Sequence, residues 1–319
     1  MGSHLADYVL ENHPDVEIFG LKRWRSPLDN VRHITGKITL IDADLRDLSS
    51  LIYLMDKTKP GVIFHLAAQS YVPTSFSAPV DTLENNIIGT ANLLESIRLT
   101  RLDPVIHICS SSEVYGQVTP EEVPIKETNP LRPASPYAVS KVGEDMLGWQ
   151  YFTSWGLKTL RTRMFTHTGP RRGDVFVASN FALQIARIEK GLQEPTILVG
   201  NLDSVRTFAD VRDTVRAYWV MVEKYFEGKV AAGDVFNIGG TTTMTIGEML
   251  DKLIALSPVK GKVSIKVDKQ RLRPSDITLQ IPCIDKFRQQ TGWEPRIPFE
   301  TTMLDLLEYW RKHISTKLV

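Results

Sequence analysis

The sequence has few cysteines, almost no net charge and no long apolar run. Only Cys109 and Cys283 are cysteines, and they are too few and too far apart for a disulfide framework. The net charge of +1 gives no indication of a surface for nucleic acid or anionic membranes. No run approaches the roughly 18 apolar residues of a membrane span, and the N-terminus has no signal-peptide pattern. We therefore expect a cytoplasmic protein without nucleic-acid or membrane partners.

The remaining composition is that of an ordinary globular protein. Of 319 residues, 42% are hydrophobic and 24% are charged, which is typical of soluble domains. This length suits two modules that share one interface. The histidines and cysteines form no cluster with metal-ligand spacing, so no metal site is predicted.

The most informative segment begins with a short apolar run at residues 105–109. It continues through Ser110, Ser111 and Ser112 to Glu113. This pattern predicts a buried parallel strand with polar side chains at its carboxyl end. Ligands of open α/β sheets bind beyond the carboxyl ends of the strands, so a binding site is expected here.

A second segment supplies a tyrosine and a lysine. Tyr137 and Lys141 follow Pro136, which is typical of a helix start, and their spacing of four puts them on one helix face. An ammonium group beside a phenol is expected to lower the phenol pKa from about 10. Together with Ser111, these side chains could bind a carbinol or a carbonyl and exchange its proton while a hydride moves elsewhere.

Ser111, Tyr137 and Lys141 resemble the triad of the extended short-chain dehydrogenase/reductase family, in its nucleotide-sugar branch. Residues 193–195, 271–276 and 291–298 are similar to segments of GDP-mannose 4,6-dehydratases and GDP-6-deoxy-4-ketomannose reductases. The resemblance covers almost the whole chain. It implies an α/β fold with a Rossmann-type doubly wound parallel sheet and a smaller mixed α/β C-terminal substrate domain. Residues 1–170 would bind NADP and carry the catalytic residues, and residues 171–319 would bind the sugar nucleotide, with the chain free to cross back.

The N-terminus departs from this pattern. Residues 1–11 resemble the helix that normally follows the first strand and the glycine fingerprint, and Gly2 resembles the last fingerprint glycine. We therefore expect the first strand to be truncated. In an alternative interpretation, residues 1–4 are a cloning remnant.

The expected cofactor is NADP rather than NAD. Arg23 and Arg25 follow the next strand, where NAD sites usually carry an acidic residue, and arginine suits a 2′-phosphate. The alternative is a solvated basic turn. The resemblance adds further residues expected to contact the cofactor, namely Asp44, Leu45, Leu66, Ala67, Ala68, Tyr137 and Lys141.

The resemblance also implies a substrate site. The residues expected to contact a GDP-sugar are Ser112, Thr166, Arg206, Arg273 and Asp276. Arg206 and Arg273 would hold the diphosphate, a task suited to a bidentate cation, and Asp276 would bind the ribose hydroxyls. Relatives carry asparagine where Thr166 stands. His167 is either a general base or a lining residue.

Glu113 distinguishes two reactions. In a 4,6-dehydratase, Tyr137 takes the C4 hydroxyl proton as hydride leaves for the nicotinamide, and a carboxylate then removes the C5 proton as the C6 hydroxyl departs. A 4-ketoreductase has no use for this carboxylate. We predict a GDP-mannose-type dehydratase with Ser111, Glu113, Tyr137 and Lys141 as catalytic residues. A reductase or a related epimerase, and an inactive truncated protein that binds sugar nucleotides, are the alternatives.

The resemblance implies that the helix at residues 81–98 and the helix bearing Tyr137 form a dimer contact, as is normal in this branch of the family. A homodimer is therefore expected, with a tetramer as the alternative.

Overall fold

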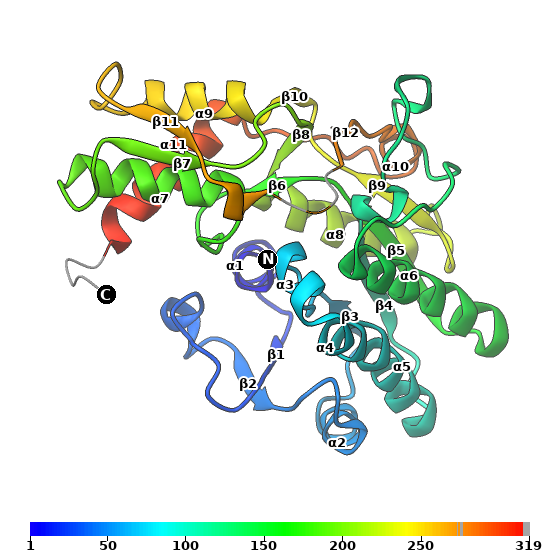
Figure 1. Cartoon of the computed structure of the whole chain (residues 1–319). Coiled ribbons are helices and arrows are strands. Elements are labelled where there is room, and N and C mark those ends of the chain that lie inside the picture. Colours follow the sequence, from blue (N-terminus) through cyan, green and yellow to red (C-terminus); the bar gives the residue numbers. More distant parts are fainter. Residues whose placement is uncertain (273, 275–276, 315–319) are drawn as a thin grey trace.

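The predicted doubly wound region contains two parallel sheets (Figure 1). The computed structural model describes residues 1–272, 274 and 277–314. The smaller sheet pairs β1 (Phe19–Lys22) with β2 (Thr39–Asp42). The larger has the order β3-β4-β5-β9, formed by Val62–His65, Val105–Ser111, Lys158–Met164 and Val235–Ile238. Within these described ranges, no strand pairs with both β1 and β3.

Helices cover both faces of these sheets. Along β4, Ile106 and Ile108 join one apolar core with α2, α5 and α6, whereas Val105 joins a second core with α8 and α10. Side chains alternate between the two faces of a strand, so the two cores lie on opposite faces. α1 packs on α8. These helices are α1 (Gly2–Asn12), α2 (Leu48–Thr58), α5 (Gly89–Thr100), α6 (Pro136–Trp155), α8 (Val211–Phe226) and α10 (Asp285–Thr291).

Local sequence explains where two of these helices begin. The Asp47 carboxylate accepts a hydrogen bond from the Ser49 amide and caps α2. Ser135 caps α6 in the same way through the Ala138 amide, and Pro136 occupies the first helical position. Both arrangements satisfy amide groups that a helix start leaves without partners.

The helix expected at residues 81–98 is not uniform. α4 (Pro79–Leu83) runs into a π-helical turn at Glu84–Ile88 before α5 begins, and α3 (Val72–Ser77) precedes it. The buried Asn86 lies in this turn. Its amide donates to the Gln69 carbonyl at 2.9 Å and to the Ser140 hydroxyl at 2.8 Å. These tertiary hydrogen bonds stabilise a local geometry that helical periodicity alone does not predict.

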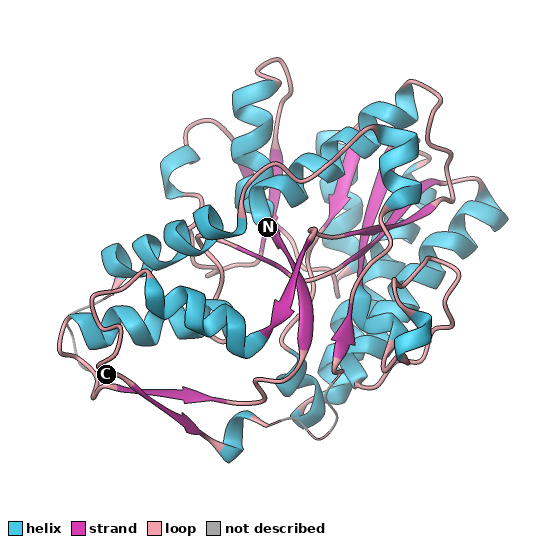
Figure 2. Cartoon of the chain, turned by 90° about the horizontal axis from the view of Figure 1, so that it is seen from above, coloured by secondary structure: helices cyan, strands magenta, loops and turns pink. Residues whose placement is uncertain are grey.

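The C-terminal region has its own core and smaller sheets (Figure 2). Its helices are α7 (Val177–Glu189), α9 (Ile246–Ala255) and α11 (Phe299–His313). The strands are β6 (His167–Thr168), β7 (Thr196–Val199), β8 (Val205–Asp210), β10 (Thr242–Thr245), β11 (Ser264–Val267) and β12 (Leu279–Gln280). β7 pairs with β11, while β10, β12 and β6 pair with β8. Between these strands the chain returns to the larger sheet as β9, so the two regions are not contiguous in sequence.

Candidate functional site

A cavity of about 990 Å³ lies at the carboxyl ends of β3, β4 and β5, where loops of the C-terminal region meet them. Its volume is in the range of small-molecule sites. Nine of the residues predicted from the sequence line it, namely Leu66, Ala68, Ser111, Ser112, Glu113, Tyr137, Lys141, Thr166 and Arg206. A smaller cavity near Asp210 and Thr302 is lined by none of them.

The turn after β4 brings Ser111 and Glu113 to this cavity. Ser111 ends the strand, and its hydroxyl accepts a hydrogen bond from the Glu113 amide at 3.2 Å. The turn closes at Gly116, where φ is +62° and an added β-carbon would lie 1.7 Å from the Arg132 carbonyl oxygen. Only glycine fits there, so the geometry that presents Glu113 depends on this residue.

Tyr137 and Lys141 lie on the same face of α6 and line the cavity together, as the spacing predicted. The sequence led us to expect a lowered pKa for Tyr137, and this expectation is wrong, because the net shift of its pKa is upward. Burial raises the pKa of Tyr137, and the Lys141 charge and the Ser111 hydroxyl offset this only in part. The cause is desolvation of the phenolate, which the sequence pattern does not reveal.

Lys141 has a partner that the sequence reasoning missed. Its ammonium donates to Glu144 Oε2 at 2.6 Å, and the two side chains are only 4% and 1% exposed. Burial raises the pKa of Glu144 to about 7, although the Lys141 charge acts in the opposite direction. The sequence signal for this ion pair was an acidic residue, Glu144, three positions after Lys141. The same spacing is common on solvent-exposed helices, so it does not by itself indicate a buried pair.

The segment after β6 contributes a half-buried arginine. Arg172 donates to His167 Nε2 at 3.1 Å, and its guanidinium stacks 3.6 Å from the Phe176 ring centroid. Burial, aided by the Arg172 charge, holds the pKa of His167 well below its usual range. The His167 ring is therefore neutral, and its Nε2 lone pair is engaged by Arg172, which favours a lining role over a general base.

Several residues predicted to bind the cofactor are outside the lining of the cavity. They are Gly2, Arg23, Arg25, Asp44, Leu45 and Ala67. The side chains of Arg23 and Arg25 are exposed, and neither contacts a carboxylate in the described part of the chain. A hydrogen bond from Arg46 lowers the pKa of Asp44. The Leu45 carbonyl accepts from the Asn92 amide at 2.9 Å.

The predicted substrate residues are described in part. Arg206 is only 8% exposed, and its guanidinium donates to the carbonyls of Val205 and Ile277. Arg273 and Asp276 lie outside the described residues. Arg271, which was not predicted, lines the cavity and donates to Asn180 Oδ1 at 2.6 Å.

The described residues contain neither a metal-binding cluster nor a membrane-spanning helix. No group of three or more histidine, cysteine, aspartate or glutamate side chains there is arranged to hold a metal ion. None of the helices in the same residues has the length and apolar character to span a membrane.

Comparison with known proteins gives consistent matches along the chain. A family model described as GDP-mannose 4,6 dehydratase matches residues 1–306. GDP-mannose 4,6-dehydratase of Vibrio cholerae is 30% identical, over 99% of this chain and 94% of that protein. GDP-6-deoxy-D-mannose reductase of Pseudomonas aeruginosa is 33% identical, over 80% of this chain and 82% of that protein.

The fold of the chain also matches solved structures over almost its whole length. RMD from Pseudomonas aeruginosa, complexed with NADPH, superposes with a TM-score of 0.81 at 29% identity, over 94% of this chain and all of that one. UDP-glucose 4-epimerase of Thermotoga maritima, with UDP-glucose, has a TM-score of 0.84 at 26% identity, over 98% and 95% of the two chains. These superpositions and the parallel strand order confirm the predicted α/β fold.

Proposed function

Because the chain belongs to the GDP-mannose 4,6-dehydratase family, we propose that it converts GDP-mannose into a 4-keto-6-deoxy sugar with bound NADP. It is an enzyme of the extended short-chain dehydrogenase/reductase type. Fold alone does not fix the reaction, so the proposal depends on the chemistry of the cavity.

One observation carries the proposal. Glu113 lines the same cavity as Tyr137 and Lys141, and it is held there by the turn that begins at Ser111. A carboxylate beside a proton-exchanging tyrosine supplies two different bases in one site. Elimination of water needs both, whereas reduction of a ketone needs only the tyrosine.

The residues divide the reaction between them. Ser111 binds the C4 oxygen, and Tyr137 accepts the C4 hydroxyl proton while the Lys141 charge stabilises the phenolate. The new C4 ketone acidifies the C5–H bond, so that Glu113 can remove the C5 proton as the C6 hydroxyl leaves, with a net loss of water. NADP would supply the hydride acceptor for C4 and, once reduced, the hydride donor for C6, and C5 takes up a proton as C6 is reduced, so the cofactor would not be consumed.

The residues that would hold NADP fit an anionic dinucleotide. Arg23 and Arg25 form no ion pair in the described ranges, the Arg25 guanidinium lies 4.3 Å from the Trp24 ring centroid, and both charges suit a 2′-phosphate. α1, which begins at Gly2, has no side-chain cap, and uncapped first-turn amides favour a pyrophosphate. Asp44 and Leu45 are assigned to the adenine, and Leu66, Ala67 and Ala68 to the turn below the cofactor.

Substrate contacts are proposed on the opposite side of the cavity. Arg206 is assigned to the diphosphate of the GDP-sugar, because a buried guanidinium can bind phosphate in a bidentate manner. Ser112 and Thr166 are assigned to the hexose. By resemblance, Arg273 would share the diphosphate and Asp276 would bind the ribose. Residues 1–170 thus form mainly the cofactor domain, and residues 171–319 mainly the substrate domain.

A 4-ketoreductase is the second candidate. It is favoured by the 33% identity with the Pseudomonas aeruginosa reductase. The same Ser111, Tyr137 and Lys141 would then protonate the C4 oxygen as hydride arrives, and Glu113 would line the cavity without moving a proton.

One experiment distinguishes the 4,6-dehydratase from the 4-ketoreductase. The protein is incubated with GDP-mannose and a catalytic amount of NADP, and the sugar nucleotide is analysed by mass spectrometry. We expect loss of one water without net NADPH formation. No conversion of GDP-mannose, together with rapid NADPH oxidation on addition of the 4-keto sugar, would assign the reductase.

The assembly is proposed to be a homodimer in the cytoplasm. α5 and α6 expose large apolar side chains, including Leu99, Val139, Met146 and Trp149, which a partner subunit would cover. Sedimentation should show a dimer in the parent and a monomer in Met146→Glu. Tyr53→Glu, an exposed aromatic residue on α2, is the control that should remain dimeric.

A further inference from the structure

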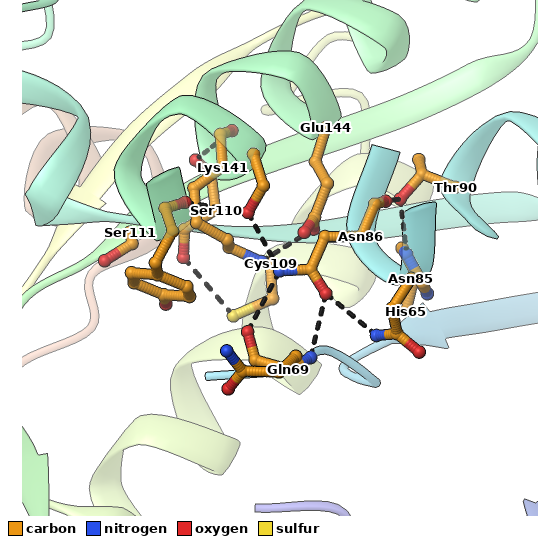
Figure 3. Close-up of polar contacts among 12 residues, drawn as sticks. His65, Gln69, Asn85, Asn86, Thr90, Cys109, Ser110, Ser111, Lys141 and Glu144 are labelled. Carbon is orange, nitrogen blue, oxygen red and sulfur yellow. Dashed lines mark hydrogen bonds and ion pairs between the residues drawn. The ribbon is translucent and has the colours of Figure 1, made fainter. Parts of the chain in front are cut away.

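The ammonium of Lys141 is held inside the protein by a second charged group. Figure 3 shows Lys141 and Glu144 among the polar side chains beneath the cavity, with the dashed contact between them. The two residues lie three apart on α6, one turn beyond Tyr137, and Glu144 is fully buried. Glu144 Oε1 has no hydrogen-bond partner in the described part of the chain, so Lys141 is the principal group that compensates this buried charge.

The other ionisable groups around this pair act differently. On α6, Asp145 is itself neutralised by Arg161 and Arg163. On β3 and β4, burial, aided by the Lys141 charge, lowers the pKa of His65 and of His107, which are therefore neutral near pH 7. Burial raises the pKa of Cys109, so this thiol is also uncharged. Across the cavity, the Arg172 charge faces Tyr137. Lys141 and Glu144 therefore act on the Tyr137 phenol from within α6, and Glu113 and Arg172 line the same cavity as Tyr137.

We propose that Glu144 is a positioning residue that holds Lys141 and sets, through its charge, the pH at which Tyr137 releases its proton. A carboxylate 2.6 Å from the ammonium cancels part of the field with which Lys141 stabilises the phenolate. In agreement with this, Lys141 lowers the pKa of Tyr137 whereas Glu144 raises it. The consequence for catalysis rests on the proposed function, in which Tyr137 exchanges the C4 hydroxyl proton.

The test is a titration of Tyr137 in the parent protein and in Glu144→Gln. Glutamine keeps the volume and can still accept from Lys141, but it has no charge. Isotopically labelled tyrosine is followed by NMR, and the Tyr137 resonance is identified as the one missing in Tyr137→Phe. We expect the midpoint to fall by about 1 pH unit in Glu144→Gln, which is about a tenfold increase in the ratio of phenolate to phenol at a fixed alkaline pH.

Two further variants separate charge from packing. Glu144→Asp keeps the charge and should titrate like the parent. Glu189→Gln removes the carboxylate of another ion pair, with Arg311 at 2.5 Å, and should leave the midpoint unchanged. An unchanged midpoint in Glu144→Gln, or an equal shift in Glu189→Gln, would overturn the proposal.

Failure of the Glu144 variants to fold would also test the proposal. If Glu144→Gln does not fold, Glu144→Met is titrated instead, because an apolar side chain of similar length can replace a buried charge. The same downward shift is expected. If neither variant is folded at room temperature by circular dichroism, Glu144 has a structural role and the proposal fails.

The titration uses no substrate and no cofactor. If GDP-mannose is not converted but the midpoint shifts as expected, the proposed function fails and the role of Glu144 stands. If GDP-mannose is converted but the midpoint does not shift, the proposed function stands and the proposed role of Glu144 fails. For an active enzyme, the rise of kcat with pH should move in the same direction as the titration.

Discussion

The Asp145 carboxylate joins α6 to β5 through Arg163, whose Nε donates to Asp145 Oδ2 at 2.6 Å. Arg161 on the same strand donates to the other carboxylate oxygen at 2.5 Å. All three side chains are buried. Because α6 carries Tyr137 and Lys141, this ion pair fixes the helix that presents them to the sheet edge.

Removing the Asp145 charge should destabilise the protein strongly. In Asp145→Asn two buried guanidinium groups lose their carboxylate, and breaking such a pair typically costs about 3–5 kcal/mol. Urea unfolding measures the loss. Asp103→Asn, which removes an exposed pair with Lys158, should cost less than about 1 kcal/mol. Similar losses in the two variants would contradict this account of α6.

Two buried histidines should destabilise the protein as the pH drops below neutrality, whereas the raised pKa of Glu144 acts in the opposite direction. Burial, aided by the Lys141 charge, lowers the pKa of His65 and of His107 to about 3. Between pH 6.5 and 3 these two histidines therefore bind protons in the unfolded chain but not in the folded protein, so their contribution to the free energy of unfolding rises with pH in this range.

Each of these histidines should lower the free energy of unfolding at pH 5, relative to that at pH 7.5, by about 2 kcal/mol. Urea unfolding at the two pH values measures this difference. His65→Asn should reduce it by about that amount, whereas Val80→Asn, at an exposed position without a titratable group, should leave it unchanged. An equal difference in the parent and in His65→Asn would mean that His65 is not buried in its neutral form.

Arg23 should select for the 2′-phosphate of the cofactor. Its exposed guanidinium has no carboxylate partner in the described ranges, and a charged hydrogen bond is worth about 1.5–3 kcal/mol. Arg23→Ala should therefore weaken NADPH binding about tenfold or more and leave NADH binding unchanged, as measured by fluorescence titration.

Arg32→Ala is the control for Arg23, because Arg32 is also exposed but is paired with Asp29. It should bind both cofactors like the parent. Equal affinity of the parent for NADPH and NADH would refute the assignment of Arg23. A protein that binds GDP but neither dinucleotide would be the inactive sugar-nucleotide binder considered above.

Local patterns were sufficient for much of the site. The apolar run at residues 105–109 predicted β4, which ends at Ser111, and the spacing of Tyr137 and Lys141 predicted their common face on α6. Both depend on interactions close in sequence, namely strand burial and helix periodicity. The turn at Glu113 also follows directly from the strand, so its position at the cavity could be anticipated.

Other features depend on contacts distant in sequence. The π-helical turn around Asn86 is stabilised by Gln69 and Ser140, and His167 is engaged by Arg172. The upward pKa shift of Tyr137 results from tertiary burial. Residue types and spacing do not show which distant side chains pack around a given polar group, and therefore these features could not be predicted.

The central claim is that Glu113 removes the C5 proton, and Glu113→Gln tests it most directly. The variant keeps the size of the side chain and its hydrogen bonding but cannot accept a proton, so the rate should fall about 10²–10⁴-fold, while GDP binding should barely change. Parent and variant are incubated with GDP-mannose and NADP in deuterated water, and the product is examined by mass spectrometry. We predict a 4-keto-6-deoxy product with deuterium at C5 in the parent and its loss in the variant. Equal deuterium incorporation at equal rates in both proteins would contradict the account.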